Sequence, residues 1–142
     1  MNLREYDPAR DGARLAGFRC SVGDAVHWVT DAPRANFQRR VLGVNEEGED
    51  LVAVVAWQDI VRVDLGGIWL EVLAVSLDHQ HAGKGAVAYD LTVDHLRTVD
   101  RDGDHLAGLV HADNDRSKRL LGSREWTFVS QWGEHELWVG LL

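Results

Sequence analysis

The sequence predicts a single α/β (α+β) domain over residues 1–142, with the element order β-α-α-β-β-β-α-β-α-β-β. The length of 142 residues fits one domain. The hydrophobic period changes from helical to strand-like near residue 50, which is the first observation behind this class. The second is the nearly all-apolar segment Ile68–Val75, which precedes a glycine-rich turn and a helix-period stretch and indicates a central, covered strand.

The N-terminal part predicts an extended segment over residues 2–6 and then a helix. Asp7-Pro8 is typical of an N-cap followed by the first helical position. Leu15, Phe18 and Val22 fall at i, i+3 and i+7, which predicts that this helix continues to about residue 20.

A second helix and a polar turn are expected next. Thr30-Asp31-Ala32-Pro33 is another helix start signal, and Gly43 is typical of a helix end. The apolar side of this helix would hold Phe37, Val41 and Leu42. Residues 45–50 are polar and predict a turn.

Three strands follow. Residues 51–56 form a short Val-rich run, and residues 60–65 alternate between apolar and polar side chains. Gly66-Gly67 predicts a turn before the strand Ile68–Val75. Adjacent strands that are joined by short turns indicate an antiparallel meander.

The second half of the chain predicts a helix, a strand, a short helix and a hairpin. The first helix extends to about Val99, with Tyr89, Val93 and Leu96 on its core side. The later elements are a turn at 100–104, a strand at 105–111, a helix from 113 to about 122, and hairpin strands at 126–131 and 136–141.

Composition excludes several classes of protein. The chain has 15 Lys and Arg against 23 Asp and Glu, so its net charge of −8 disfavours non-specific binding to nucleic acids. Cys20 is the lone cysteine, so no internal disulfide forms, and a small buried hydrophobe is its expected role. No apolar run approaches the roughly 20 residues that span a bilayer, and no signal-peptide pattern is present. We therefore expect a cytoplasmic protein.

The most informative segment is Gln80-His81-Ala82-Gly83-Lys84-Gly85-Ala86, which lies between the apolar strand and a helix. Gly83 and Gly85 would let a ligand approach the backbone, and the N–H groups at the helix start would form an anion site suited to a pyrophosphate. Lys84 would add a positive charge. The alternative is a tight turn that binds nothing.

This segment resembles the acetyl-coenzyme A loop of the GCN5-related N-acetyltransferases (the GNAT superfamily), and the element order resembles their fold over nearly the full chain. The resemblance implies a mixed, mostly antiparallel sheet flanked by helices, in which the strand at 105–111 splays from the strand at 70–75. It also implies acetyl-coenzyme A as co-substrate. The residues that it implies for binding are Leu73, Val75, Leu77, Gln80, His81, Ala82, Gly83, Lys84, Gly85, Ala86, Asn114 and Ser117.

The chain departs from the family at the general acid. The family places a Tyr seven residues after the Asn that corresponds to Asn114, and this chain has Leu121 there. Ser117, a water molecule or Tyr89 are the alternatives for the proton donor.

Glu71 is the leading candidate for the catalytic base, because it is the only charge in the strand Ile68–Val75. A half-buried carboxylate there would have a raised pKa. The alternative is that Glu71 reaches solvent or pairs with Arg62. His111 is the reserve base, and the backbone N–H of Val75 could polarise the acyl carbonyl.

A metal site is not expected. His79 and His81 are geometrically loose, and His111 and Asp113 add no second cluster with ligand spacing. The segment Asp100–Asp104 lacks the closing Glu of a calcium loop and is interpreted as a turn.

Two functions remain open. The first is an N-acetyltransferase that acts on a primary amine of a small molecule or peptide by direct attack in a ternary complex. The alternative is a catalytically weak or inactive acyl-coenzyme A-binding module, which Leu121 favours. Phe18-Arg19-Cys20 faintly resembles toxin-type acetyltransferases that modify aminoacyl-tRNA, but the acidic balance disfavours a tRNA partner. Trp28 is a candidate wall of the acceptor site, and the apolar hairpin 126–141 could mediate a homodimer.

Overall fold

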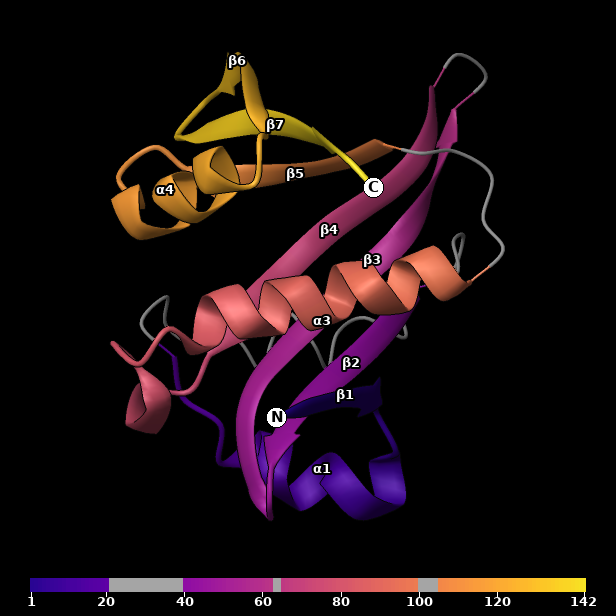
Figure 1. Cartoon of the computed structure of the whole chain (residues 1–142), viewed down its shortest axis with the longest axis vertical. Helices are drawn as coiled ribbons and strands as arrows, with labels where there is room; N and C mark the ends of the chain where they lie inside the picture. The colour runs from indigo at the N-terminus through magenta and orange to yellow at the C-terminus, as the bar shows by residue number, and fades with distance from the viewer. Residues whose placement is uncertain (21–39, 63–64, 100–104) are drawn as a thin grey trace.

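A computed structural model describes residues 1–20, 40–62, 65–99 and 105–142 of the chain (Figure 1). Its elements are β1 (Asn2–Glu5), α1 (Pro8–Ala16), β2 (Arg40–Glu47), β3 (Asp50–Arg62), β4 (Leu65–Val75), the 3-10 helix η2 (Leu77–His79), α3 (Lys84–Thr98), β5 (His105–His111), α4 (Asp115–Ser123), β6 (Thr127–Trp132) and β7 (His135–Leu141). The helix start at 30–33, Val22, Trp28, Phe37 and the turn at 100–104 lie outside the described residues.

Within the described residues, seven strands form one sheet in the order β1-β2-β3-β4-β5-β7-β6. The neighbouring strands pair antiparallel, except that β4 and β5 pair parallel. The connection from β4 to β5 passes through α3, which lies across one face of the sheet (Figure 1). This mixed sheet with flanking helices confirms the predicted fold class.

Two hydrophobic clusters hold the helices on the sheet. The cluster under α3 joins Tyr89, Val93 and Leu96 to strand residues such as Val55 and Ile68. The other cluster packs Leu15 and Phe18, from α1 and the turn that follows it, against β2, β3 and β4. The predicted core side of α3 is therefore confirmed, and so is the burial of Leu15 and Phe18.

The predicted end of the second helix is wrong, because Val41 and Leu42 lie in strand β2. A short apolar run fits a strand as well as a helix, and here the pairing with β3 decides for the strand. Gly43 lies inside β2 and ends no helix. A Cβ atom there would come within 2.8 Å of the Cδ1 atom of Leu3 and 3.0 Å of the Trp57 ring, so a larger residue would force these side chains to shift.

The structure contains an antiparallel meander, but β2, β3 and β4 form it, and the predicted division into strands 51–56, 60–65 and 68–75 is wrong. Residues 51–56 and 60–62 belong to the single long strand β3, Leu65 begins β4, and residues 45–47 belong to β2 instead of a turn. Gly67 lies within β4 instead of in a turn. A Cβ atom on Gly67 would lie 2.7 Å from the carbonyl oxygen of His105, so this glycine permits the close approach of β5.

The helix boundaries are close to the predicted ones except at the end of α1. Asp7 is the N-cap of α1, and its carboxylate accepts a hydrogen bond from the N–H of Ala9 at 3.0 Å. The helix ends at Ala16, four residues before the predicted end near residue 20. Within the described residues, no helix is long and apolar enough to cross a membrane.

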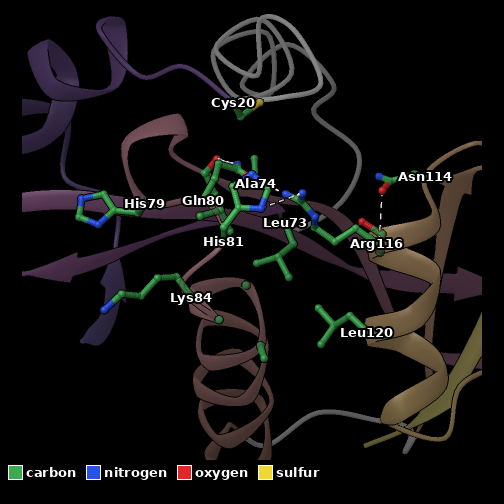
Figure 2. A pocket seen from close by; sticks show the side chains of 15 residues that line it. Cys20, Leu73, Ala74, His79, Gln80, His81, Lys84, Asn114, Arg116 and Leu120 are labelled. Atoms are coloured by element: carbon green, nitrogen blue, oxygen red, sulfur yellow. Dashed lines mark hydrogen bonds between the residues drawn. The ribbon is translucent and has the colours of Figure 1, made fainter.

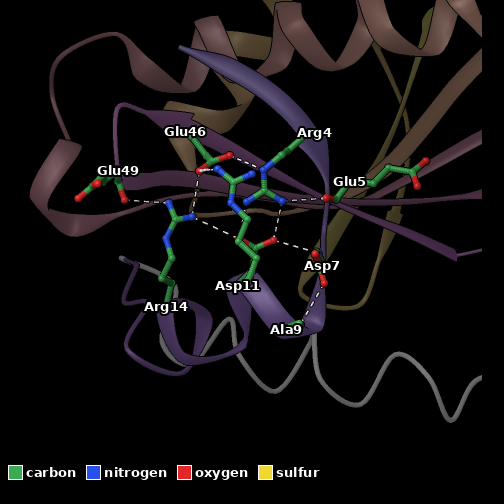
Figure 3. Close-up of polar contacts among 9 residues, drawn as sticks. Arg4, Glu5, Asp7, Ala9, Asp11, Arg14, Glu46 and Glu49 are labelled. Atoms are coloured by element: carbon green, nitrogen blue, oxygen red, sulfur yellow. Dashed lines mark hydrogen bonds and ion pairs between the residues drawn. The ribbon is translucent and has the colours of Figure 1, made fainter.

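A buried ion-pair network joins β1, α1 and β2 at the end of the molecule that carries α1 (Figure 3). The Arg4 guanidinium donates to Asp11 at 2.7 Å and also to Glu46, and Arg14 donates to Glu46 at 2.9 Å. Asp11 is fully buried, and its hydrogen bond with Arg4 lowers its pKa to about 2. No local pattern predicts this network, because Glu46 lies 42 residues from Arg4 and 32 from Arg14 in the chain.

Candidate functional site

The two central strands separate halfway along the sheet (Figure 1). Among the described residues, β4 and β5 pair only through Ile68 with Leu106 and Trp69 with Ala107. Beyond Trp69, β4 continues to Val75 with no further pairing to β5. The expectation that these strands splay apart is therefore confirmed.

A β-bulge lies in β4 two residues past Trp69, the last residue that pairs with β5. Trp57 of β3 pairs with Leu70 and Ala56 pairs with Val72, so Glu71 is the extra residue. Leu70 and Leu73, an odd number of positions apart, consequently both pack on the cluster under α3. The bulge thus changes which side chains of β4 face α3, and Glu71 stands where β4 and β5 part.

A cavity of about 270 Å³ lies between the free end of β4, the loop before α3 and the start of α4 (Figure 2). Among the described residues its lining comprises Cys20, Leu73, Ala74, Val75, His79, Gln80, His81, Gly83, Lys84, Gly85, Ala86, Asn114, Arg116, Ser117 and Leu120. Ten of the twelve residues predicted to bind the co-substrate are in this set. The structure therefore brings the glycine-rich loop and the start of α4 to one place.

The loop presents backbone N–H groups at the start of α3. Gly83 is the N-cap with φ +72°, a left-handed conformation that favours glycine, and no side chain caps the helix. The first-turn N–H groups of a helix have no partner within it, and they carry the positive end of the helix dipole. This cradle of N–H groups beside the cavity is chemically suited to an anion.

Side-chain amide and guanidinium groups join this loop to its surroundings. The Nε2 atom of Gln80 donates to the carbonyl oxygen of Val75 at 2.8 Å. Arg116 of α4 donates from Nη1 to Oε1 of Gln80 at 2.5 Å, and its Nη2 atom lies 3.3 Å from Nδ1 of His81. Arg116 was not among the predicted residues, although its place in the first turn after Asn114 was a signal that could have found it.

Lys84 does not add a free positive charge to the loop, contrary to the prediction. Its Nζ atom forms an ion pair with Oε2 of Glu47 at 2.5 Å. Hydrogen bonding to Lys84 lowers the pKa of the Glu47 carboxyl. Figure 2 shows the Lys84 side chain pointing away from Gln80 and Arg116. Glu47 of strand β2 thus neutralises the Lys84 cation that the sequence analysis placed in the loop.

Two predicted binding residues lie outside the lining. Leu77 belongs to η2 and not to the strand, which ends at Val75, and 50% of its surface is exposed. Ala82 is exposed at the tip of the loop. At the opposite wall, Asn114 is the N-cap of α4, and its Oδ1 atom accepts from the N–H of Ser117 at 3.2 Å.

Comparison with solved structures identifies the architecture. The GNAT domain of PAT from S. lividans superposes on 99% of this chain and 89% of its own length, with a TM-score of 0.76 and 17% sequence identity. The chain has the GNAT fold. An acetyltransferase from Thermus thermophilus gives a TM-score of 0.68 at 17% identity and covers 100% of this chain and 98% of its own.

A third structure with this fold was solved with a ligand. It is yncA from Salmonella typhimurium with its cofactor acetyl-CoA, which has a TM-score of 0.66 and 16% identity and covers 100% of this chain and 94% of its own. No protein-family model and no curated protein matches the sequence. The GNAT assignment therefore rests on the fold.

The candidate catalytic residues are distributed unevenly around the GNAT cavity. Ser117 lines it. Glu71 is half-buried at the bulge, two residues before Leu73 of the lining. His111 lies at the far end of β5, where its ring is 5.3 Å from that of His135 and 3.9 Å from the Glu134 carboxylate. Among the described lining residues, His111 is absent.

Neither Leu121 nor Tyr89 offers an acid to the cavity. Leu121 is buried in the cluster under α3. The hydroxyl of Tyr89 accepts a hydrogen bond from Nε1 of Trp126 at 2.6 Å, and burial raises the pKa of Tyr89. Within the described residues, no group of three or more His, Cys, Asp or Glu side chains could hold a metal ion.

Proposed function

We propose that this chain is an acetyl-coenzyme A-dependent N-acetyltransferase whose acceptor is a primary amine of a small molecule or peptide. One observation carries the proposal. The cavity where β4 and β5 part is lined by the start of α3, which no side chain caps, and by the cationic side chain of Arg116. This combination is suited to an anionic ligand with an apolar arm. The GNAT fold supports this interpretation, and a structure with the same fold holds acetyl-CoA.

The residues present fit acetyl-coenzyme A. The first-turn N–H groups of Lys84, Gly85 and Ala86 would hold its diphosphate. Leu73 and Leu120 form apolar walls for the pantetheine arm. When bound, acetyl-coenzyme A supplies a thioester whose acyl carbon is open to attack by an amine.

The chain's own groups then have separate tasks in a direct transfer within a ternary complex. The carboxylate of Glu71 takes a proton from the incoming ammonium, directly or through water. A backbone N–H near the end of β4, at Val75, polarises the acyl carbonyl. The Ser117 hydroxyl, or a water molecule beside it, returns a proton to the leaving group.

A thiol-release assay with a panel of amines tests the activity. The panel should include a polyamine, an aminoglycoside-like amine and a peptide with a free basic N-terminus, because the chain is acidic. We expect thiol release that depends on both acetyl-coenzyme A and one class of amine.

Glu71→Gln tests the base. We expect kcat to fall by about a hundredfold or more, as for loss of a general base, with binding of acetyl-coenzyme A retained. Glu49→Gln, at an exposed turn position, is the matched control and should leave turnover unchanged. If Glu71→Gln has wild-type kcat across the pH range, Glu71 is not the base.

A catalytically inactive acyl-coenzyme A-binding module is the second candidate, and the burial of Leu121 in the core favours it. Among the described residues of the cavity lining there is no tyrosine that could act as the acid. Tight binding without thiol release for any amine would support this module. The cytoplasmic location and the homodimer stay predictions.

A further inference from the structure

We propose that Arg116 is a specificity-determining residue that recognises the diphosphate of the acyl donor. Its guanidinium contacts Gln80 and His81, and on binding of the donor it exchanges these partners for the phosphate oxygens. This inference rests on the proposed function, and it names the chemical feature by which the site selects its donor.

Arg116 is placed to do this by the start of α4. Its guanidinium extends from the first turn of α4 to the loop, where Gln80 and His81 contact it at 2.5 and 3.3 Å (Figure 2). The loop follows β4, and α4 follows β5. The Arg116 contact therefore joins the wall of the cavity that follows β4 to the wall that follows β5. Arg116 lines the same cavity as residues 84–86 at the start of α3.

The charge of Arg116 is not neutralised. In the part of the chain that the structure describes, no carboxylate lies within 4.0 Å of its guanidinium, and both partners are formally neutral when His81 is unprotonated. Lys84, the other long cation of the lining, is instead paired with Glu47. Of the two, Arg116 is thus the one with charge left for a ligand.

The partner exchange is favourable on chemical grounds. A guanidinium presents its N–H groups in a planar fork that matches two phosphate oxygens. Hydrogen bonds between ionised partners are stronger than those from the same donor to a neutral amide or imidazole. Arg116 is exposed, so it can move from Gln80 without disturbing the core.

The position of Arg116 predicts which acyl donors the site selects. Donors that carry a diphosphate next to the pantetheine arm gain the Arg116 contact together with the helix start. Thioesters of pantetheine alone gain neither. The structure therefore assigns discrimination between these two donor classes partly to Arg116.

Calorimetric titration of the full chain with coenzyme A, at low and at high salt, tests the inference. Arg116→Gln should weaken binding by about tenfold to a hundredfold at low salt, the loss expected for a charged hydrogen bond. The substitution should also make the dissociation constant less dependent on salt, because salt no longer screens a contact between Arg116 and phosphate. Arg116→Lys should recover part of both effects.

Arg119→Gln is the matched control, since Arg119 is exposed on the same helix and forms no hydrogen bond or ion pair within the described residues. It removes the same charge from α4 and should change the dissociation constant by less than about twofold. Thermal unfolding of each variant checks that α4 is intact.

Three results would overturn the inference. The first is that Arg116→Gln binds coenzyme A as the wild type does. The second is weaker binding with an unchanged salt dependence, which would mean a structural role, and the third is a loss of affinity equal to that of Arg119→Gln, which would mean a long-range effect of charge. If the wild-type protein itself binds no coenzyme A, the proposed function fails, and that result is distinct from a failure of the Arg116 assignment alone.

Discussion

At the scale of single residues, Asp11 is a fully buried carboxylate held by arginines from two elements. A buried charge is tolerated only where partners replace its water. Arg4 and Arg14 supply those partners, and they connect Asp11 with Glu46. The network therefore fixes β1 and α1 against β2.

Asp11→Asn should destabilise the protein by about 2 kcal/mol at pH 7, from the difference between a pKa of 3.8 unfolded and about 2 folded. Because the folded pKa is the lower one, this stability is present above about pH 4 and is lost as the pH falls toward 2. Denaturant unfolding should thus show a variant-to-wild-type difference that shrinks to roughly half at pH 3.

Asp94→Asn is the control for Asp11→Asn. Asp94 is exposed and its pair with Arg97 at 3.6 Å is a surface contact, so its loss should change stability by less than about 0.5 kcal/mol. An equal effect from both substitutions would contradict the account of the buried network.

At the scale of elements, the hairpin of β6 and β7 shows how one glycine admits a large side chain. A Cβ atom at Gly140 of β7 would lie 2.6 Å from Nε1 of Trp126. Trp126 is buried and donates to the hydroxyl of Tyr89 in α3. The hairpin, α3 and the end of α4 are therefore held together at this point.

Gly140→Ala should destabilise the protein by about 1–3 kcal/mol, the usual result of forcing extra atoms into a packed core. Gly122→Ala, in α4, is the matched substitution, because nothing lies within 4 Å of its added Cβ. It should be neutral or stabilising by up to about 1 kcal/mol. Thermal unfolding of both variants measures this, and an unharmed Gly140→Ala would contradict the packing at Trp126.

The elements that the sequence predicted well are those with local signals. The start of α1 at Asp7, the core side of α3 and the strand 105–111 all follow from spacing or capping chemistry. The strand identity of Val41 and Leu42 did not follow, because pairing with β3 is a long-range contact that no local pattern encodes.

In the candidate site, too, residues in a local motif were predicted and residues placed by long-range contacts were not. The loop residues 80–86 were predicted from a contiguous motif, and most of them line the cavity. The ion pair that removes Lys84 from the loop and the contact that places Arg116 there connect residues more than thirty positions apart. Such pairings appear only once the sheet has set which elements are neighbours.

At the scale of the whole molecule, β6 ends the sheet within the described residues and presents apolar side chains. The exposed ones on this strand are Phe128, Val129 and Trp132, each about half exposed. Unpaired edges with apolar side chains are typical sites of association between chains. This placement supports the expected homodimer through the hairpin 126–141.

Light scattering at tens of micromolar protein should give the mass of a dimer. Val129→Lys places a charge on the edge and should give the mass of a folded monomer. A wild-type monomer at that concentration would exclude this homodimer.

The central claim is that the cavity between β4 and α4 binds the acyl donor, and calorimetric titration with acetyl-coenzyme A, without acceptor, tests it most directly. The wild type should bind in the micromolar range, and Gly83→Asp should weaken binding by more than about tenfold because it brings a carboxylate to the anion cradle. Gly133→Asp carries the same charge and similar backbone strain, with φ +61° against +72°, in the β6–β7 turn, and it should bind as the wild type does. Absence of wild-type binding, or equal binding by Gly83→Asp, would contradict the account.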